Sequence, residues 1–185
     1  MSTTDVAARV ERVSQQLADT IRAVPAEAWG NPSPCEGWTA RDVVAHLVEW
    51  IPGYLGAQGV PVPDIPAVDD DPVAAWEAVR EMVRRALADP VLAGKQIETP
   101  FFTQSLADTV EMIVTSDVLV HGWDLSRAAG LDETLDPEMV SRMLATVGTM
   151  PEEVMQADGM FGPRVEVPDG ADDQTRLLGL LGRRA

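Results

Sequence analysis

The chain contains only two histidines, His46 and His121, and Asp117 stands four residues before the second of them. Residues four apart in a helix lie one turn above each other on the same face. Two imidazoles and a carboxylate are the protein ligands of many catalytic zinc sites, which keep a fourth position open, and also of the facial triad that binds Fe(II). The three residues therefore predict a divalent-metal site, provided that two helices bring them together.

The same three residues also have a purely structural interpretation. A buried Asp–His pair at this spacing can be an internal hydrogen bond, and His46 beside Trp50 can be a packing residue. A carboxylate and an imidazole on an apolar helix face are costly to bury unless they are paired or bound to a cation. Periodicity alone leaves the metal site and the hydrogen-bonded core as equal alternatives.

The single cysteine and an acidic segment are weaker candidates for a site. Cys35 lies shortly before a predicted helix, where the helix dipole can lower a thiol pKa, but the adjacent Glu36 opposes thiolate formation. No base beside Cys35 is identifiable from the sequence, so a nucleophilic role is disfavoured. Residues 68–72, "VDDDP", lack the spacing of a calcium-binding loop and are interpreted as a helix N-terminus.

The helix that would carry His46 has clear boundaries in the sequence. Thr39 and Asp42 resemble a capping box, so a helix is expected over 40–51. Pro52 should end it, because proline lacks the backbone N–H that the helix interior needs. His46 then lies on the shoulder of the apolar face, from where it can point into a bundle interior.

The helix that would carry the other two residues is the longest in the chain. It is expected over 105–129, with Gly130 as its C-cap. At about 100° per residue, Asp117 and His121 fall in the middle of a broad apolar face, and Asp124 lies close to the axis of that face.

The remaining segments also predict a helical chain. Residues 52–71 are rich in Gly, Pro and Asp and are expected to form a long loop that could act as a lid. A β-like patch, "RVEV", and a short final helix are expected near the C-terminus. Further helices are predicted over 4–23, 72–88 and 137–149.

Length and composition restrict the function classes. A single domain over 1–185 is expected. The formal net charge of −16 would repel nucleic acids and anionic membranes, so neither is expected as a partner. No apolar run is long enough to span a bilayer, the first residues do not resemble a signal peptide, and one cysteine permits no intramolecular disulfide. A cytoplasmic protein is therefore expected.

Four segments resemble a known family. "PSPCEGWTARDVVAHL", "TPFF", "DVLVHGWDLSRAAG" and "FGPRVEVPDGADDQTRLLGLLGRR" are similar to actinobacterial metal-binding proteins related to the N-terminal domain of mycothiol-dependent maleylpyruvate isomerase, in the DinB-like superfamily. The resemblance implies an all-α, up-down-down-up four-helix bundle. It also implies a divalent metal held by His46, Asp117 and His121, where the isomerases have Glu in place of Asp117. Zinc is the first expectation, with iron or nickel as alternatives.

The resemblance also suggests a function. Superfamily members include transferases and isomerases that use mycothiol, bacillithiol or glutathione. The leading hypothesis is a metal-dependent transferase or isomerase that uses mycothiol on a small electrophilic metabolite, with a metal-bound thiolate as nucleophile. The alternatives are a non-catalytic bundle that binds a metal or small ligand, and a metal-free structural or partner-binding domain. The expected partners are a small-molecule substrate and a low-molecular-weight thiol, and a homodimer through a helix face is a further expectation.

Overall fold

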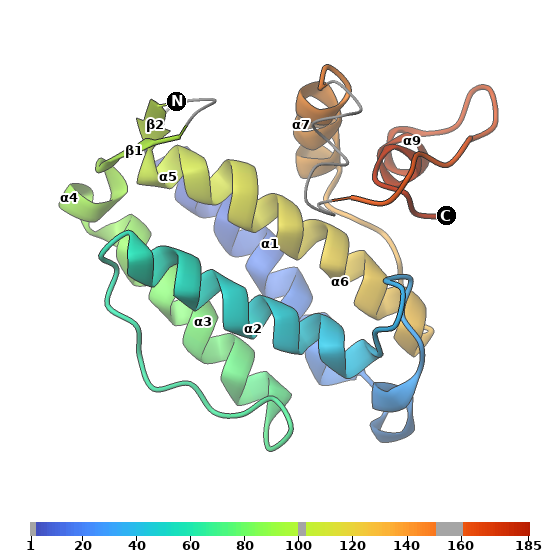
Figure 1. Ribbon diagram of the computed structural model, residues 1–185, viewed down its shortest axis with the longest axis horizontal. Helices are drawn as coiled ribbons and strands as arrows, with labels where there is room; N and C mark the ends of the chain where they lie inside the picture. Colours follow the sequence, from blue (N-terminus) through green and yellow to red (C-terminus); the bar gives the residue numbers. More distant parts are fainter. Residues whose placement is uncertain (1–2, 100–102, 151–160) are drawn as a thin grey trace. The chain divides into compact units, whose positions relative to one another are not determined.

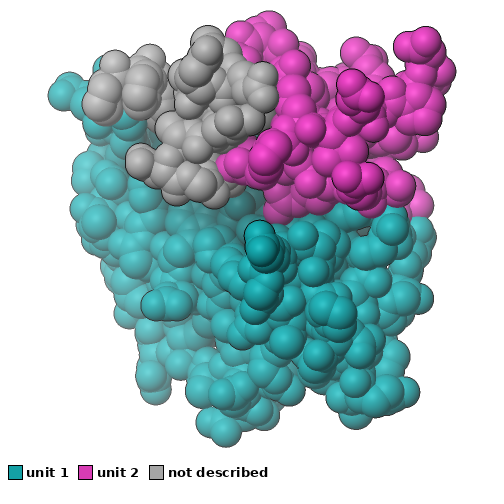
Figure 2. All heavy atoms as spheres, turned by 45° about the vertical axis from the view of Figure 1, so that its right-hand side comes forward, with its two compact units in different colours: residues 1–133 teal, residues 134–185 magenta. Residues whose placement is uncertain are grey.

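The computed structural model describes residues 3–99, 103–150 and 161–185. The chain divides into two compact units, residues 1–133 and 134–185, which are coloured separately in Figure 2. Each unit is described here by itself. The expectation of a single domain over 1–185 stays a prediction.

The first unit is a four-helix bundle. Its helices are α1 (Thr3–Ala23), α2 (Ala40–Ala57), α3 (Pro72–Ala88) and a continuous fourth rod made of α5 (Leu106–Thr109), the π-helical segment η2 (Val110–Thr115) and α6 (Ser116–Ala129). The first helix and the fourth rod run in one direction, whereas α2 and α3 run in the other (Figure 1). Both α1 and α2 pack against α3 and against α6. This arrangement confirms the all-α, up-down-down-up bundle, of the DinB-like kind, that the resemblance implied.

The bundle forms because each helix buries one apolar face. On α1 and α2 the buried side chains recur at helical spacing, and full burial of a Val, Leu or Ile side chain contributes about 1.5–3 kcal/mol. The buried apolar residues of these two helices include Val6, Val10, Val13, Leu17 and Ile21 on α1, and Val43, Val44, Leu47, Ile51 and Leu55 on α2.

The start of α2 agrees with the sequence-based prediction. Thr39 is the N-cap, its side chain accepts from the backbone N–H of Asp42, and the Asp42 carboxylate accepts from the backbone N–H of Thr39 at 2.8 Å. This reciprocal capping box satisfies two of the backbone donors that a helix N-terminus leaves without intrahelical partners.

The predicted end of α2 is wrong. Pro52 lies inside the helix, which continues to Ala57. An interior proline costs about 3 kcal/mol. The extra turn offsets this cost because it buries Pro52 and Leu55 in the bundle, and Leu55 has no exposed surface. The loop that follows is therefore shorter than 52–71, and its role as a lid stays a prediction.

A small connection leads from α3 to the fourth rod. It contains α4 (Pro90–Ala93) and the antiparallel strands β1 (Gln96–Glu98) and β2 (Thr103–Ser105). Gln96 is opposite Ser105 in the register of this two-stranded sheet. A short helix η1 (Ala26–Gly30) lies between α1 and α2.

Among its described residues, the second unit contains the helices α7 (Pro137–Val147) and α9 (Asp173–Leu180), which pack against each other. The final helix was expected, and α7 begins at the expected proline. The "RVEV" segment, which was expected to be β-like, joins no strand among the described residues. Instead, the backbone N–H of Val165 donates to the carbonyl of Gly179 on α9 at 2.9 Å. Across the described parts of both units, no helix combines the length and the apolar character needed to span a membrane.

Candidate metal centre

The structure brings His46, Asp117 and His121 together between α2 and α6. One donor atom from each residue lies within 4.8 Å of the others. His46 Nε2 is 3.4 Å from Asp117 Oδ2, and His121 Nε2 is 3.5 Å from Asp117 Oδ1. The Asp117 carboxylate therefore lies between the two imidazoles, whose ring centroids are 5.0 Å apart. The three candidate ligands predicted from sequence spacing form one cluster, and metal binding by them stays a proposal.

The fourth rod is not the uniform α-helix that the sequence predicted. Its middle, Val110–Thr115, is π-helical, and the hydroxyl of Thr115 donates to the carbonyl of Val110 at 3.1 Å. A π-helical turn contains more residues than an α-helical turn, so it changes which faces of the rod the residues before and after it occupy. Such turns are frequent at functional sites, and this one ends two residues before Asp117.

A buried ion pair joins the π-helical segment to α1. Glu111 and Arg9 are both almost fully buried, and the guanidinium Nε of Arg9 donates to the Glu111 carboxylate. Buried charges are tolerated when they are paired in this way. This contact fixes the rod against α1 one and a half turns before Asp117. The sequence analysis did not identify either residue.

Besides the two histidines, the Asp117 carboxylate has a third neighbour, Trp50, which lies on α2. The indole Nε1–H of Trp50 donates to Asp117 Oδ2 at 2.8 Å. Trp50 lies one turn after His46, so the same face of α2 supplies one candidate ligand and a hydrogen bond to another. The sequence analysis noted Trp50 only as a packing neighbour of His46.

The other edge of His121 faces a second group of polar side chains. His121 Nδ1 is 2.9 Å from Asp124 Oδ2, and the Asp124 side chain has no exposed surface. The thiol of Cys35 donates to the same Asp124 oxygen at 3.3 Å and lies 3.9 Å from His121 Nδ1. These three residues form another group whose donor atoms lie within 4.8 Å of one another. The sequence placed Asp124 near the axis of the face but gave it no role.

The charges around His121 determine its protonation. Burial of the ring lowers the pKa of His121, but the hydrogen bonds to Asp124 and Cys35 and the charges of Asp117 and Asp124 outweigh burial and raise the pKa to about 10. Without a cation, the cluster therefore holds an imidazolium at neutral pH. A metal ion bound to this ring would take the place of the proton.

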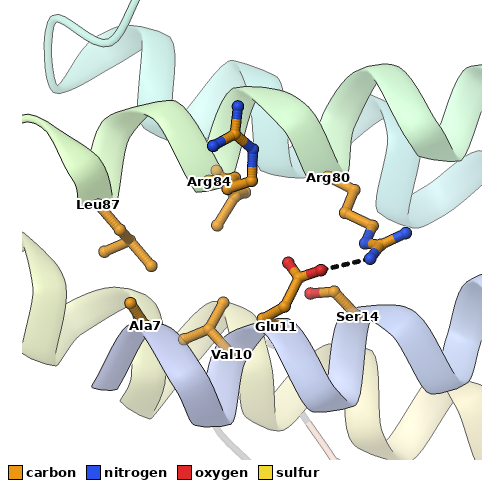
Figure 3. A pocket seen from close by; sticks show the side chains of 8 residues that line it. Ala7, Val10, Glu11, Ser14, Arg80, Arg84 and Leu87 are labelled. Carbon is orange, nitrogen blue, oxygen red and sulfur yellow. Dashed lines mark hydrogen bonds and ion pairs between the residues drawn. The ribbon is translucent and has the colours of Figure 1, made fainter. Parts of the chain in front are cut away.

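A separate hollow lies between α1 and α3 and has a volume of about 260 Å³ (Figure 3). Its walls include Val10 and Leu87, and Glu11 and Arg80 form an ion pair at its edge. None of the candidate metal ligands lines this hollow.

The fold and the cluster define a class of protein: an up-down-down-up four-helix bundle with a His/Asp/His cluster between its second and fourth helices. Residues 10–126 match the model of the mycothiol maleylpyruvate isomerase N-terminal domain family. The chain belongs to this family. The matched range contains all three candidate ligands.

The chain is also similar to two proteins of Mycobacterium tuberculosis, one from strain CDC 1551 and one from strain H37Rv. Each is 27% identical to this chain over 177 residues, which are 94% of this chain and 94% of the relative. Both are described only as uncharacterized proteins. No solved structure gives a significant match.

Proposed function

We propose that this protein is a divalent-metal-dependent enzyme that uses mycothiol to transfer a thiol to, or to isomerise, a small electrophilic metabolite. The observation that carries the proposal is the convergence of two imidazole nitrogens and a carboxylate from α2 and α6 within 4.8 Å of one another. The family name, which refers to a mycothiol-dependent isomerase, supports the choice of thiol and reaction class.

The spacing of the donor atoms suits an ion of the size of zinc. Nitrogen and oxygen ligands that bind tetrahedral zinc at about 2.0–2.1 Å lie roughly 3.4 Å from one another. Asp117 Oδ2 lies 3.4 Å from His46 Nε2 and Asp117 Oδ1 lies 3.5 Å from His121 Nε2, so each carboxylate oxygen is at this spacing from one imidazole nitrogen. The combination of two imidazoles and one carboxylate also suits iron, and nickel remains an alternative.

Each residue of the cluster has a role in this proposal. His46, Asp117 and His121 would hold the metal, which supplies a Lewis acid that favours the thiolate form of a bound thiol. Trp50 holds the Asp117 carboxylate through its indole N–H. Trp38, whose ring centroid is 4.9 Å from that of His46 and 5.7 Å from that of His121, shields both imidazoles on one side.

Metal content tests the site before any substrate is chosen. We expect about one equivalent of zinc, iron or nickel per chain in protein purified without chelator, measured by mass spectrometry of the digested sample. His46→Ala and His121→Ala should lose the metal, because each removes one of three ligands. Glu49→Gln, which alters an exposed carboxylate on the same helix as His46, is the control and should retain it. Metal-free wild-type protein that binds none of these ions on addition would contradict the proposal.

Turnover tests the reaction class. The metal-loaded protein, supplied with mycothiol, is assayed against activated alkenes, epoxides and alkyl halides for thioether formation, and against cis-alkenes conjugated to carbonyl groups for isomerisation. We expect turnover in the wild type and in Glu49→Gln, and loss of turnover in His121→Ala. Equal turnover in wild type and His121→Ala would remove the metal from the mechanism. Metal binding without any turnover would favour the non-catalytic binding protein.

A further inference from the structure

We propose that Cys35 and Asp124 form a positioning pair that sets the orientation and tautomer of His121, so that the loop 31–39 controls the metal affinity of the site. This inference rests on the proposed metal centre. It concerns residues outside the candidate ligand set of His46, Asp117 and His121.

Asp124 determines which nitrogen of His121 faces the other ligands. A fully buried carboxylate 2.9 Å from Nδ1 accepts a hydrogen bond from an Nδ1–H group. When a metal replaces the second proton of the ring, the remaining proton would be held on Nδ1, and the Nε2 lone pair would be directed toward Asp117 and His46. Metal-binding histidines commonly donate their second N–H to a carboxylate, which fixes the ring and makes it a stronger ligand.

Cys35 fixes the Asp124 carboxylate in turn. Its thiol donates to Oδ2, the same oxygen that faces His121 Nδ1. This hydrogen bond assigns Cys35 a role as a donor that holds the Asp124 carboxylate in place. The thiol therefore supports the histidine through Asp124.

The loop that presents Cys35 is itself tightly held. Within it, the backbone N–H of Ser33 donates to the carbonyl of Trp38 at 2.8 Å, and the N–H of Trp38 donates to the carbonyl of Cys35 at 3.1 Å. Gly37 has a φ of +78°, in the left-handed region that favours glycine, which allows this tight turn. The Asn31 side chain donates to the carbonyl of Ala128 on α6 at 3.0 Å, which ties the loop to the helix that carries His121.

The same loop contacts His121 from a second direction. The ring of Trp38 lies over that of His121 with an interplanar angle of 25°, while Cys35 is placed near the Nδ1 edge. One short loop therefore restrains both the face and the edge of a single imidazole. This double restraint distinguishes loop 31–39 from an ordinary connection between two helices.

Zinc affinity, measured by competition with a chromophoric chelator, tests the positioning role. We expect Asp124→Asn to weaken zinc binding about 10- to 100-fold, the range typical for loss of such an outer partner. Cys35→Ala should weaken it several-fold, whereas Cys35→Ser should stay close to wild type, because a serine hydroxyl can also donate to Asp124. Glu49→Gln is the carboxylate-to-amide control and should bind as wild type.

The outcomes separate this inference from the proposed function. Wild-type protein without zinc affinity contradicts both proposals. Zinc binding that is equally tight in wild type, Asp124→Asn and Cys35→Ala leaves the metal centre intact and overturns only the positioning pair. Should Asp124→Asn fail to give a native circular dichroism spectrum, the comparison of Cys35→Ala with Cys35→Ser decides the question.

Two spectroscopic measurements report on the same atoms without any assay of turnover. In the zinc-loaded protein, nitrogen-15 NMR should show His121 protonated at Nδ1, with the signal assigned by nuclear Overhauser contacts between this N–H and the nearby Cys35 side chain. The cobalt-substituted protein should show ligand-field bands without a thiolate charge-transfer band. A strong charge-transfer band that disappears in Cys35→Ser would mean that Cys35 is itself a ligand, and would overturn the positioning role.

Discussion

At the scale of single residues, the centre of the site is the Asp117 carboxylate. It lies 3.4 Å from one imidazole and 3.5 Å from the other, and it accepts a hydrogen bond from Trp50. An aspartate has one rotatable bond fewer than a glutamate, and a hydrogen bond to its carboxylate fixes the remaining freedom of the side chain. The tryptophan is the neighbour that donates this hydrogen bond.

The first prediction follows from this hydrogen bond. Trp50→Phe keeps an aromatic ring but removes the N–H that donates to Asp117. Because hydrogen bonds to charged groups contribute about 1.5–3 kcal/mol, we expect zinc affinity to fall about 10-fold or more. Trp29→Phe, which alters a tryptophan whose ring lies under the Arg41 guanidinium, is the control. Isothermal titration calorimetry gives both affinities, and equal values would show that Trp50 does not support the ligand.

At the scale of elements, the extension of α2 past Pro52 predicts how a substitution in the extended part changes the stability of the protein. Gly53 is helical and exposed, and a Cβ atom added there would meet nothing within 4 Å. We expect Gly53→Ala to raise the free energy of unfolding by about 0.5–1 kcal/mol, because glycine is a poor helix former. Gly130→Ala should instead destabilise, since Gly130 has a φ of +68°. Urea unfolding measures both, and a destabilising Gly53→Ala would contradict the extended helix.

The capping box of α2 predicts a pH dependence. Hydrogen bonds from the side chain and backbone of Thr39 lower the pKa of Asp42 below its ordinary value of 3.8. A group whose pKa is lower in the folded state stabilises the fold above its unfolded pKa and loses that contribution as the pH falls through the folded value. Urea titrations should therefore show wild type more stable than Asp42→Ala above about pH 4, with a difference that shrinks below pH 3.8. A pH-independent difference would contradict the ionised cap.

The elements also show what the sequence could and could not predict. The capping box and the i, i+4 pair on the long helix are local signals. The start of α2 and the grouping of Asp117 with His121 could therefore be predicted from the sequence. The continuation of α2 past Pro52 depends on burial of Leu55 against other helices, which a local helix-breaking rule omits. The amino-acid sequence of the π-helical segment contains no local signal that predicts a π-helix.

The residues that contact the Nδ1 edge of His121 show the same limit of sequence-based prediction. Asp124 is three residues from His121, so its proximity could have been inferred from helix geometry. Cys35 is 89 residues from Asp124 in the sequence, and only the folded bundle places its thiol beside that carboxylate. Spacing within one helix therefore predicted the grouping of Asp117 with His121, whereas the place of Cys35 depends on contacts between distant parts of the chain.

At the scale of the whole molecule, the candidate ligands connect two helices that are far apart in the sequence. His46 comes from α2 and the other two ligands come from α6, and these helices pack against each other. A bound cation would also offset some repulsion within a chain of net charge −16. Metal binding to the folded state should therefore stabilise the protein as well as prepare the site.

The last prediction concerns this link between metal binding and the stability of the fold. A ligand that binds only the folded state stabilises it by about 2.7 kcal/mol at a concentration 100 times its Kd. We expect the Tm of metal-free protein to rise by several degrees on addition of zinc, and the gain to be reversed by EDTA. In His46→Ala the cation has lost its ligand on α2, so zinc should no longer join the two helices and the rise in Tm should largely disappear. Differential scanning calorimetry makes the measurement, with Glu49→Gln as the control. The same zinc-dependent rise in wild type and in His46→Ala would mean that the ion acts elsewhere on this acidic chain and does not bind between α2 and α6.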